Sequence, residues 1–160
     1  MKSAPNQGST FTIYLMLAEF ALAAAAETPS PLPRGNGERV LLVDDEAPVL
    51  AVTAEVLTRL GYEPMCFSDS QAALAAFEAA PRRFDVVVTD DLMPGISGTG
   101  LASVVRRRRP DLPIVLVSGY SGPILTQHAL AAGVSELLTK PLQSREIATT
   151  LARVLHHAAS

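Results

Sequence analysis

Apolar residues along this chain gather in five short runs, separated by longer stretches in which they recur with helical spacing. The runs are short, mostly apolar and bounded by turn residues, which predicts buried strands. We expect these strands at Val40–Val43, Tyr62–Phe67, Asp85–Thr89, Pro113–Val117 and Ser135–Leu138.

The stretches that follow the strands predict helices that bury one apolar face each. In the first, Val49, Val52, Val56 and Leu60 recur at helical spacing, and we expect them to face the core. Four helices are expected at Ala47–Leu60, Leu101–Arg108, Pro123–Ala132 and Ser144–His157. A further helix, second in chain order, is expected to begin after Ser68 or Asp69, either of which can cap it.

Strand and helix therefore alternate five times. Such alternation predicts βαβ units with right-handed crossovers, and hence an α/β fold with a parallel sheet covered on both faces. In a parallel sheet all strands point the same way, so the residues that follow them meet at one edge.

Composition narrows the possible functions. The chain has 160 residues, 48% hydrophobic residues and a net charge of −3, which suits one soluble domain and gives no reason to expect nucleic acid as a partner. The single cysteine, Cys66, cannot form an internal disulfide, so we expect a reducing, cytoplasmic location and a small, buried Cys66 side chain. Monomer or weak dimer is the expected state.

Polar residues follow four of the predicted strands at their carboxyl ends. Asp44 and Asp45 follow the first, Asp90 the third, Ser118 the fourth and Lys140 the fifth. Carboxylates that converge repel one another unless a cation lies among them, and Mg²⁺ prefers such oxygen ligands. A lysine and a hydroxyl at the same edge would receive an anion, so the pattern predicts a site where an aspartate accepts a phosphoryl group.

Residues 39–158 resemble the receiver domain of two-component response regulators. The resemblance rests on the acidic pair, an Asp-x-x-Met-Pro motif at Asp90–Pro94, the hydroxyl residue Ser118, and Lys140-Pro141. It implies a flavodoxin-like (βα)5 doubly wound sheet with strand order 2-1-3-4-5. It also implies that Asp90 takes a phosphoryl group from a phosphohistidine, with Mg²⁺ as cofactor and a histidine kinase or histidine phosphotransfer protein as partner.

The resemblance also assigns roles at this edge. The ligands of Mg²⁺ would be Asp45, Asp90 and the backbone carbonyl of Leu92. Asp44 would bind the ion directly or through a water molecule, and Asp45 would be the closer of the acidic pair. Ser118 and Lys140 would bind the phosphoryl oxygens. Ser118 and Leu137 occupy the switch positions, although Leu137 replaces the usual aromatic residue.

Three other positions depart from the family pattern. Ser97 stands where an aspartate often precedes the glycine, and Leu92 and Tyr120 replace groups that are often polar near the attacking water. An apolar group at Leu92 and a bulky group at Tyr120 should hinder in-line attack, which predicts slow hydrolysis of the phosphoaspartate.

Residues 1–38 differ from the rest and end in the proline- and glycine-rich linker 28–37. We expect a strand at Phe11–Leu17 and a short helix at Leu17–Ala26. A membrane span or a signal peptide fits Phe11–Ala26 less well, because the segment is short and contains Glu19. Pro5–Leu15 resembles the closing segment of the ATP-binding domain of sensor histidine kinases, through Gly8, Ser9, Thr10 and Phe11.

The favoured prediction is the C-terminal receiver of a hybrid sensor histidine kinase, which by itself is not an enzyme. A stand-alone single-domain regulator that acts as a binding switch is the first alternative. A second alternative is a phosphatase with an aspartyl nucleophile, but such enzymes usually have a second catalytic acid where this chain has Leu92. A third is a receiver that binds partners without phosphate, and the presence of Asp90 and Lys140 argues against it. The arginines at 106–109 are interpreted as cations that favour a helix carboxyl end, and not as a nucleic-acid site.

Overall fold

The computed structural model describes residues 2–3, 9–10 and 31–158. The chain divides into two compact units, Met1–Pro31 and Leu32–Ser160. In the first unit, β1 (Lys2–Ser3) pairs antiparallel with β2 (Ser9–Thr10). The strand and helix expected within 11–26 lie outside the described residues, as do Gly8 and Phe11 of the kinase-like segment.

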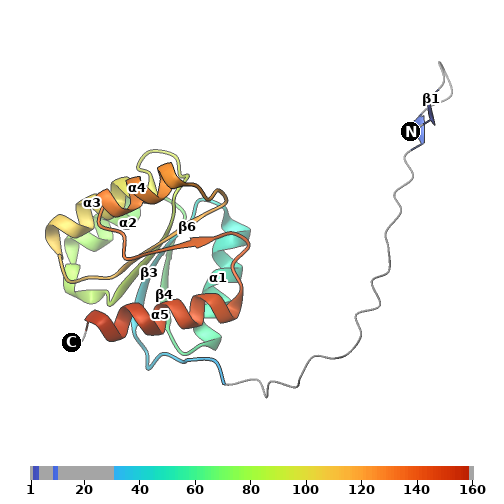
Figure 1. Cartoon of the computed structure of the whole chain (residues 1–160). Coiled ribbons are helices and arrows are strands. Elements are labelled where there is room, and N and C mark those ends of the chain that lie inside the picture. Colours follow the sequence, from blue (N-terminus) through green and yellow to red (C-terminus); the bar gives the residue numbers. More distant parts are fainter. Residues whose placement is uncertain (1, 4–8, 11–30, 159–160) are drawn as a thin grey trace. The chain divides into compact units, whose positions relative to one another are not determined.

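The second unit is a five-stranded parallel sheet in the order β4-β3-β5-β6-β7 (Figure 1). Counted within this sheet, the order is 2-1-3-4-5, as the sequence predicts. The strands are β3 (Arg39–Val43), β4 (Glu63–Phe67), β5 (Val86–Asp90), β6 (Ile114–Ser118) and β7 (Glu136–Thr139).

Helices cover both faces of this sheet, which accounts for strands that are apolar throughout. The apolar cores under the two faces are separate: residues of α1 and α5 pack on one face, and residues of α2, α3 and α4 pack on the other (Figure 1). The helices are α1 (Ala47–Arg59), α2 (Ser70–Ala79), the short 3₁₀ turn η1 (Pro81–Arg83), α3 (Gly98–Arg108), α4 (Pro123–Ala131) and α5 (Ser144–Ala158).

One expectation about burial holds only in part, and another is wrong. In α1 the buried residues are Leu50, Thr53 and Leu57, whereas Val52 is 62% exposed; of the expected inward residues, Leu60 just after the helix is buried and Val56 packs on the core. Both stripes have helical spacing, so periodicity alone could not choose between them, and the face toward β3 and β4 was settled by packing. Cys66 is exposed because β4 is the edge strand of the sheet and this side chain is not covered.

Local signals explain how the helices begin and end. The Asp69 side chain caps α2 by accepting the Ala72 N–H at 2.7 Å, as predicted. Ser97 does the same for α3 by accepting the Gly100 N–H, so α3 begins at Gly98 and not at Leu101. After α1, Gly61 adopts a φ of 91°, the left-handed conformation that ends the helix.

The segment before β3, which begins the second unit, packs against the rest of that unit. Gly35 and Gly37 donate backbone hydrogen bonds to the carbonyls of Leu60 and Gly61, both at 2.8 Å, and Leu32 packs on the core beneath α1 and α5. A side chain at Gly35 would collide with the ring of Tyr62, 2.5 Å away. Part of the predicted linker is therefore held by backbone contacts.

Candidate functional site

The edge formed by the carboxyl ends of the strands holds a lysine between two buried carboxylates. The Lys140 Nζ lies 2.7 Å from Asp90 Oδ1 and 3.0 Å from Asp44 Oδ2. Glu46 Oε1 lies further out, at 3.4 Å from the same nitrogen. The Asp44 and Asp90 side chains are 9% and 7% exposed, so their charges are compensated mainly by this ammonium group.

Asp90 is the last residue of β5, and the backbone fixes its position. Its Oδ2 accepts the Leu92 N–H at 2.9 Å. Gly98 is packed so tightly against this residue that an added Cβ would lie 2.1 Å from the Asp90 carbonyl oxygen. The start of α3 can therefore approach the end of β5 only because residue 98 is glycine.

Burial raises the pKa of the Asp90 carboxyl, and the Asp44 charge adds to this, although Lys140 and the Leu92 N–H oppose it. For Lys140, burial by itself would lower the pKa, but the hydrogen bonds and charges of Asp90 and Asp44 outweigh burial and raise it. The lysine is thus protonated at neutral pH, and it provides the positive charge at this edge.

Ser118, at the end of β6, is buried and lies next to this group in the sheet. The Lys140 N–H donates to the Ser118 carbonyl at 2.8 Å, and the Ser118 Oγ accepts the Tyr120 N–H at 3.2 Å. Leu137 is half-buried in β7 and packs on the core beneath α2, α3 and α4. It occupies the register position opposite Leu116.

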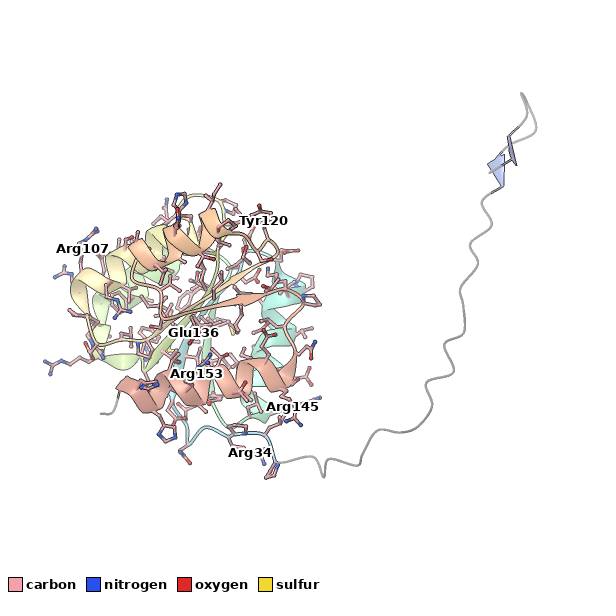
Figure 2. The ribbon with its side chains drawn as sticks, in the orientation of Figure 1. Arg34, Arg107, Tyr120, Glu136, Arg145 and Arg153 are labelled. Carbon is pink, nitrogen blue, oxygen red and sulfur yellow. The ribbon has the colours of Figure 1, made fainter. Side chains whose placement is uncertain are left out.

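Two large apolar side chains stand out from the same edge. Leu92 is 74% exposed and Tyr120 is 64% exposed, and Tyr120 is labelled at the periphery in Figure 2. Asp91, next to Asp90, is buried, and its backbone N–H donates to the Val117 carbonyl at 2.9 Å. The backbone of Asp91 is thus fixed by a hydrogen bond to the neighbouring strand β6.

Ser70 is a positioning residue that sequence reasoning missed. Its buried hydroxyl donates to the Pro94 carbonyl and accepts the Ile96 N–H, both at 3.1 Å. It thereby anchors the loop after Asp90 to the start of α2. A serine 24 residues before Pro94 gives no local signal of this contact, because it depends on the tertiary packing of two loops.

The carboxylate oxygens at this edge are the type of ligand that a hard cation prefers, and the ammonium group of Lys140 lies among them. Asp44 and Asp90 offer carboxylate oxygens, and Asp45 beside them is exposed. Among the residues that the structure describes, no group of three or more His, Cys, Asp or Glu side chains is placed to hold a metal ion. The structure thus joins Asp44, Asp90 and Lys140, with Ser118 adjacent, and leaves Asp45 outside this cluster.

No helix in the described residues is both long and apolar enough to cross a membrane. Five parallel strands in this order, with two buried carboxylates and a lysine at their carboxyl ends, define a flavodoxin-like α/β domain. The chain belongs to the response regulator receiver domain family, whose model matches residues 40–152.

Known proteins agree with this assignment. The chain is 32% identical over 158 residues to the sensor histidine kinase AruS of Pseudomonas aeruginosa, covering 96% of this chain and 15% of that protein. It is also 32% identical over 121 residues to the phosphate regulon transcriptional regulatory protein PhoB of the same organism, covering 74% of this chain and 52% of PhoB. The chain thus spans about half the length of these relatives or less.

A solved structure shows the same fold. The chemotaxis protein CheY4 of Vibrio cholerae superposes with a TM-score of 0.69 at 31% identity, covering 74% of this chain and 98% of that one. The chain is therefore a receiver domain of two-component systems, a family that implies a histidine kinase as phosphodonor and generally uses Mg²⁺.

Proposed function

We propose that Asp90 accepts a phosphoryl group from a phosphohistidine. One Asp90 carboxylate oxygen attacks phosphorus, an O–P bond forms, and the N–P bond to the imidazole breaks with its electron pair returning to nitrogen. The observation that carries this proposal is Lys140, which lies 2.7 Å from Asp90 and supplies a positive charge where the phosphoryl oxygens would arrive.

Asp44, Asp45, Asp90 and the Leu92 carbonyl would hold Mg²⁺. When bound, the ion neutralises the charge that develops on the phosphoryl oxygens. Lys140 would keep contact with the phosphoryl group, and the Ser118 hydroxyl would donate a hydrogen bond to it. The switch at Ser118 and Leu137 would then lack an aromatic ring to rotate.

The test is phosphorylation by a small-molecule phosphodonor, with and without Mg²⁺, followed by intact-mass analysis. We expect one phosphoryl adduct that requires Mg²⁺ and is absent from Asp90→Asn. Asp91→Asn is the matched control, because the neighbouring carboxylate should be dispensable as an acceptor. An adduct that survives in Asp90→Asn and disappears in Asp91→Asn would refute the assignment.

For the whole protein, we propose the C-terminal receiver of a hybrid sensor histidine kinase. The alignment with AruS supports this, because it covers 96% of this chain and so extends into residues before the receiver. Not itself an enzyme, the domain would pass its phosphoryl group to a histidine phosphotransfer protein. The similarity to PhoB supports the alternative of a response regulator. A kinase core encoded in frame upstream would decide for the hybrid kinase, and a stop codon there would decide against it.

The exposed apolar groups at this edge predict a long-lived phosphoaspartate. Leu92 offers no polar group to orient a water molecule for in-line attack on phosphorus, and the bulky Tyr120 ring hinders the approach of that water. Leu92→Asn is therefore expected to speed hydrolysis by roughly tenfold, measured as decay of the phosphorylated mass. Leu130→Asn, also highly exposed but on α4, is the control. Equal decay rates for wild type and Leu92→Asn would refute this prediction.

A further inference from the structure

The opposite edge of the sheet, at the amino ends of β5 and β6, carries a concentration of arginines that phosphoryl transfer does not use. Arg82 and Arg83 lie in η1, just before β5, and the run 106–109 ends α3, just before β6. Only two of the 13 basic residues in the chain are lysines, Lys2 and Lys140, so this edge presents guanidinium groups. Guanidinium groups are suited to bidentate binding of phosphate.

Two of these arginines have structural partners. Arg106 Nε donates to the Gly133 carbonyl at 3.1 Å. Arg109 donates to the Pro81 carbonyl at 2.9 Å and pairs with Asp111 at 2.6 Å. These contacts give Arg106 and Arg109 a structural role, so no ligand is needed to explain their positions. The hydrogen bond from Arg109 to the Pro81 carbonyl also fastens η1 to the end of α3.

The remaining arginines of this edge have no such partner. Within the described part of the chain, no ion pair or side-chain hydrogen bond involves Arg82, Arg83, Arg107 or Arg108. Arg107 points away from the body of the domain (Figure 2). Arg82, Arg83 and Arg108 instead line one cleft, together with Arg109.

This cleft encloses about 500 Å³ and is lined by Ala80, Pro81, Arg82, Arg83, Arg108 and Arg109. Four of these six lining residues are arginines, and none carries a carboxylate. An adjoining cleft shares Arg82, Arg108 and Arg109 but also contains Asp85 and Asp111. Asp111 is already paired with Arg109, and the Asp85 Oδ2 accepts the Arg39 N–H at 2.8 Å. The first cleft is thus the one that contains arginines and no carboxylate.

We propose that this cleft binds a small ligand with a chain of linked phosphates, at the size of a nucleotide. Three arginines without ion-pair partners line this cleft, and the hydrogen bond from Arg109 to the Pro81 carbonyl holds η1 beside the end of α3, so the cleft suits a ligand with several phosphates. The space is within the range of small-ligand sites, and Ala80 and Pro81 provide an apolar wall beside the charges. The proposal does not depend on phosphorylation of Asp90.

Other anionic partners fit less well. Only four of the 13 basic residues line this small cleft, and the chain has a net charge of −3, whereas nucleic-acid surfaces carry extended basic stripes. The large exposed apolar side chains of the described residues are Val52, Leu92, Tyr120, Ile124 and Leu130, and none lines this cleft, so a lipid surface would find no apolar anchor.

The test is isothermal titration of the full chain, without Mg²⁺, with inorganic tripolyphosphate and with a nucleoside triphosphate. Saturable one-to-one binding is expected. In Arg82→Gln/Arg108→Gln the affinity should fall at least about tenfold, since each substitution removes charge-assisted hydrogen bonds. Arg107→Gln/Arg145→Gln is the matched control: it makes the same change of net charge at exposed positions outside the cleft (Figure 2) and should lose less than about twofold.

Asp90→Asn should bind the probes as wild type does, which separates this cleft from the phosphoacceptor edge. Equal affinity for both probes would assign recognition to the phosphate chain alone, and tighter binding of the nucleotide would add a contact with the base; both support the proposal. Equal losses in the two double variants would overturn it by showing a mere net-charge effect. Absence of saturable binding, or binding of RNA or anionic vesicles without binding of tripolyphosphate, would also overturn it.

Discussion

The two edges of the receiver sheet both collect charge, but they treat it differently. At the carboxyl edge the charges are buried, and Lys140 contacts both Asp44 and Asp90. At the amino edge, Arg82, Arg83 and Arg108 are exposed or partly exposed and have no ion-pair partner among the described residues. A buried charge without a partner is costly, whereas an exposed one remains hydrated. At the carboxyl edge, the stability of the domain therefore depends on charge compensation between Lys140 and the two carboxylates. At the amino edge, the unpaired arginines remain available to bind an anionic ligand.

The comparison is tested most strongly by Lys140→Met. Removing the ammonium group leaves Asp44 and Asp90 facing each other without compensation, so we expect a loss of about 3 kcal/mol in the free energy of unfolding at pH 7. Urea titration measures it. Arg145→Met, at an exposed position, should change stability by less than about 0.5 kcal/mol. If Lys140→Met proves equally harmless, the carboxylates are compensated in another way.

The second test is Gly98→Ala. The new methyl group would meet the Asp90 carbonyl oxygen, so we expect a loss of about 2 kcal/mol and slower phosphorylation, as α3 and β5 move apart. Gly119→Ala is the control at the same edge, since nothing lies within 4 Å of a Cβ placed there. Thermal unfolding of both variants separates the two cases. Similar melting temperatures would contradict the close approach described here.

The third test uses pH. Burial raises the pKa of Asp90, so over the range between its ordinary and its raised pKa the native state binds more protons than the unfolded state. This contribution to stability is present at low pH and is lost as the pH rises through the raised pKa. Asp90→Asn should therefore be more stable than wild type at pH 7, by about 1 kcal/mol. The difference should shrink as the pH falls toward 4, measured by urea unfolding across that range. A difference that grows on acidification would contradict the sign.

The smallest expected effect lies at the amino edge. The hydrogen bond from Arg109 lowers the pKa of Asp111 to about 2. In Arg109→Gln this pKa should return toward its ordinary value, followed by the carboxyl carbon chemical shift in an NMR titration. Stability should change little at neutral pH, because Asp111 is exposed. An unchanged pKa would show that the Arg109–Asp111 pair does not persist in solution.

The parallel sheet and the meeting of Asp44, Asp90 and Lys140 could be predicted because they follow from the alternation of elements and from the residues that end each strand. The strand order was available only through the resemblance to receiver domains. The buried face of α1 could not be predicted in the same way. Leu50, Thr53 and Leu57 have the same spacing as Val49, Val52 and Val56, and only contact with the sheet distinguishes the two stripes.

Contacts between distant loops were also beyond the sequence. Ser70 reaches Pro94 and Ile96, and Arg109 reaches Pro81, in each case over more than 20 residues. No periodicity records such a contact, because it depends on how helices pack on the sheet. Ser97 shows the reverse case: the residue was noted as a departure from the family pattern, and the structure shows it as the cap of α3.

The ammonium group of Lys140 also has a consequence for amine chemistry. Acylating reagents attack only the uncharged amine, and the carboxylates around Lys140 raise its pKa and keep that form scarce at neutral pH. Because Lys2 is the sole other lysine among these 160 residues, mild acylation should modify Lys2 and spare the receiver. A fluorophore or a surface tether could thus be attached there, leaving the Asp90 chemistry intact for measurement.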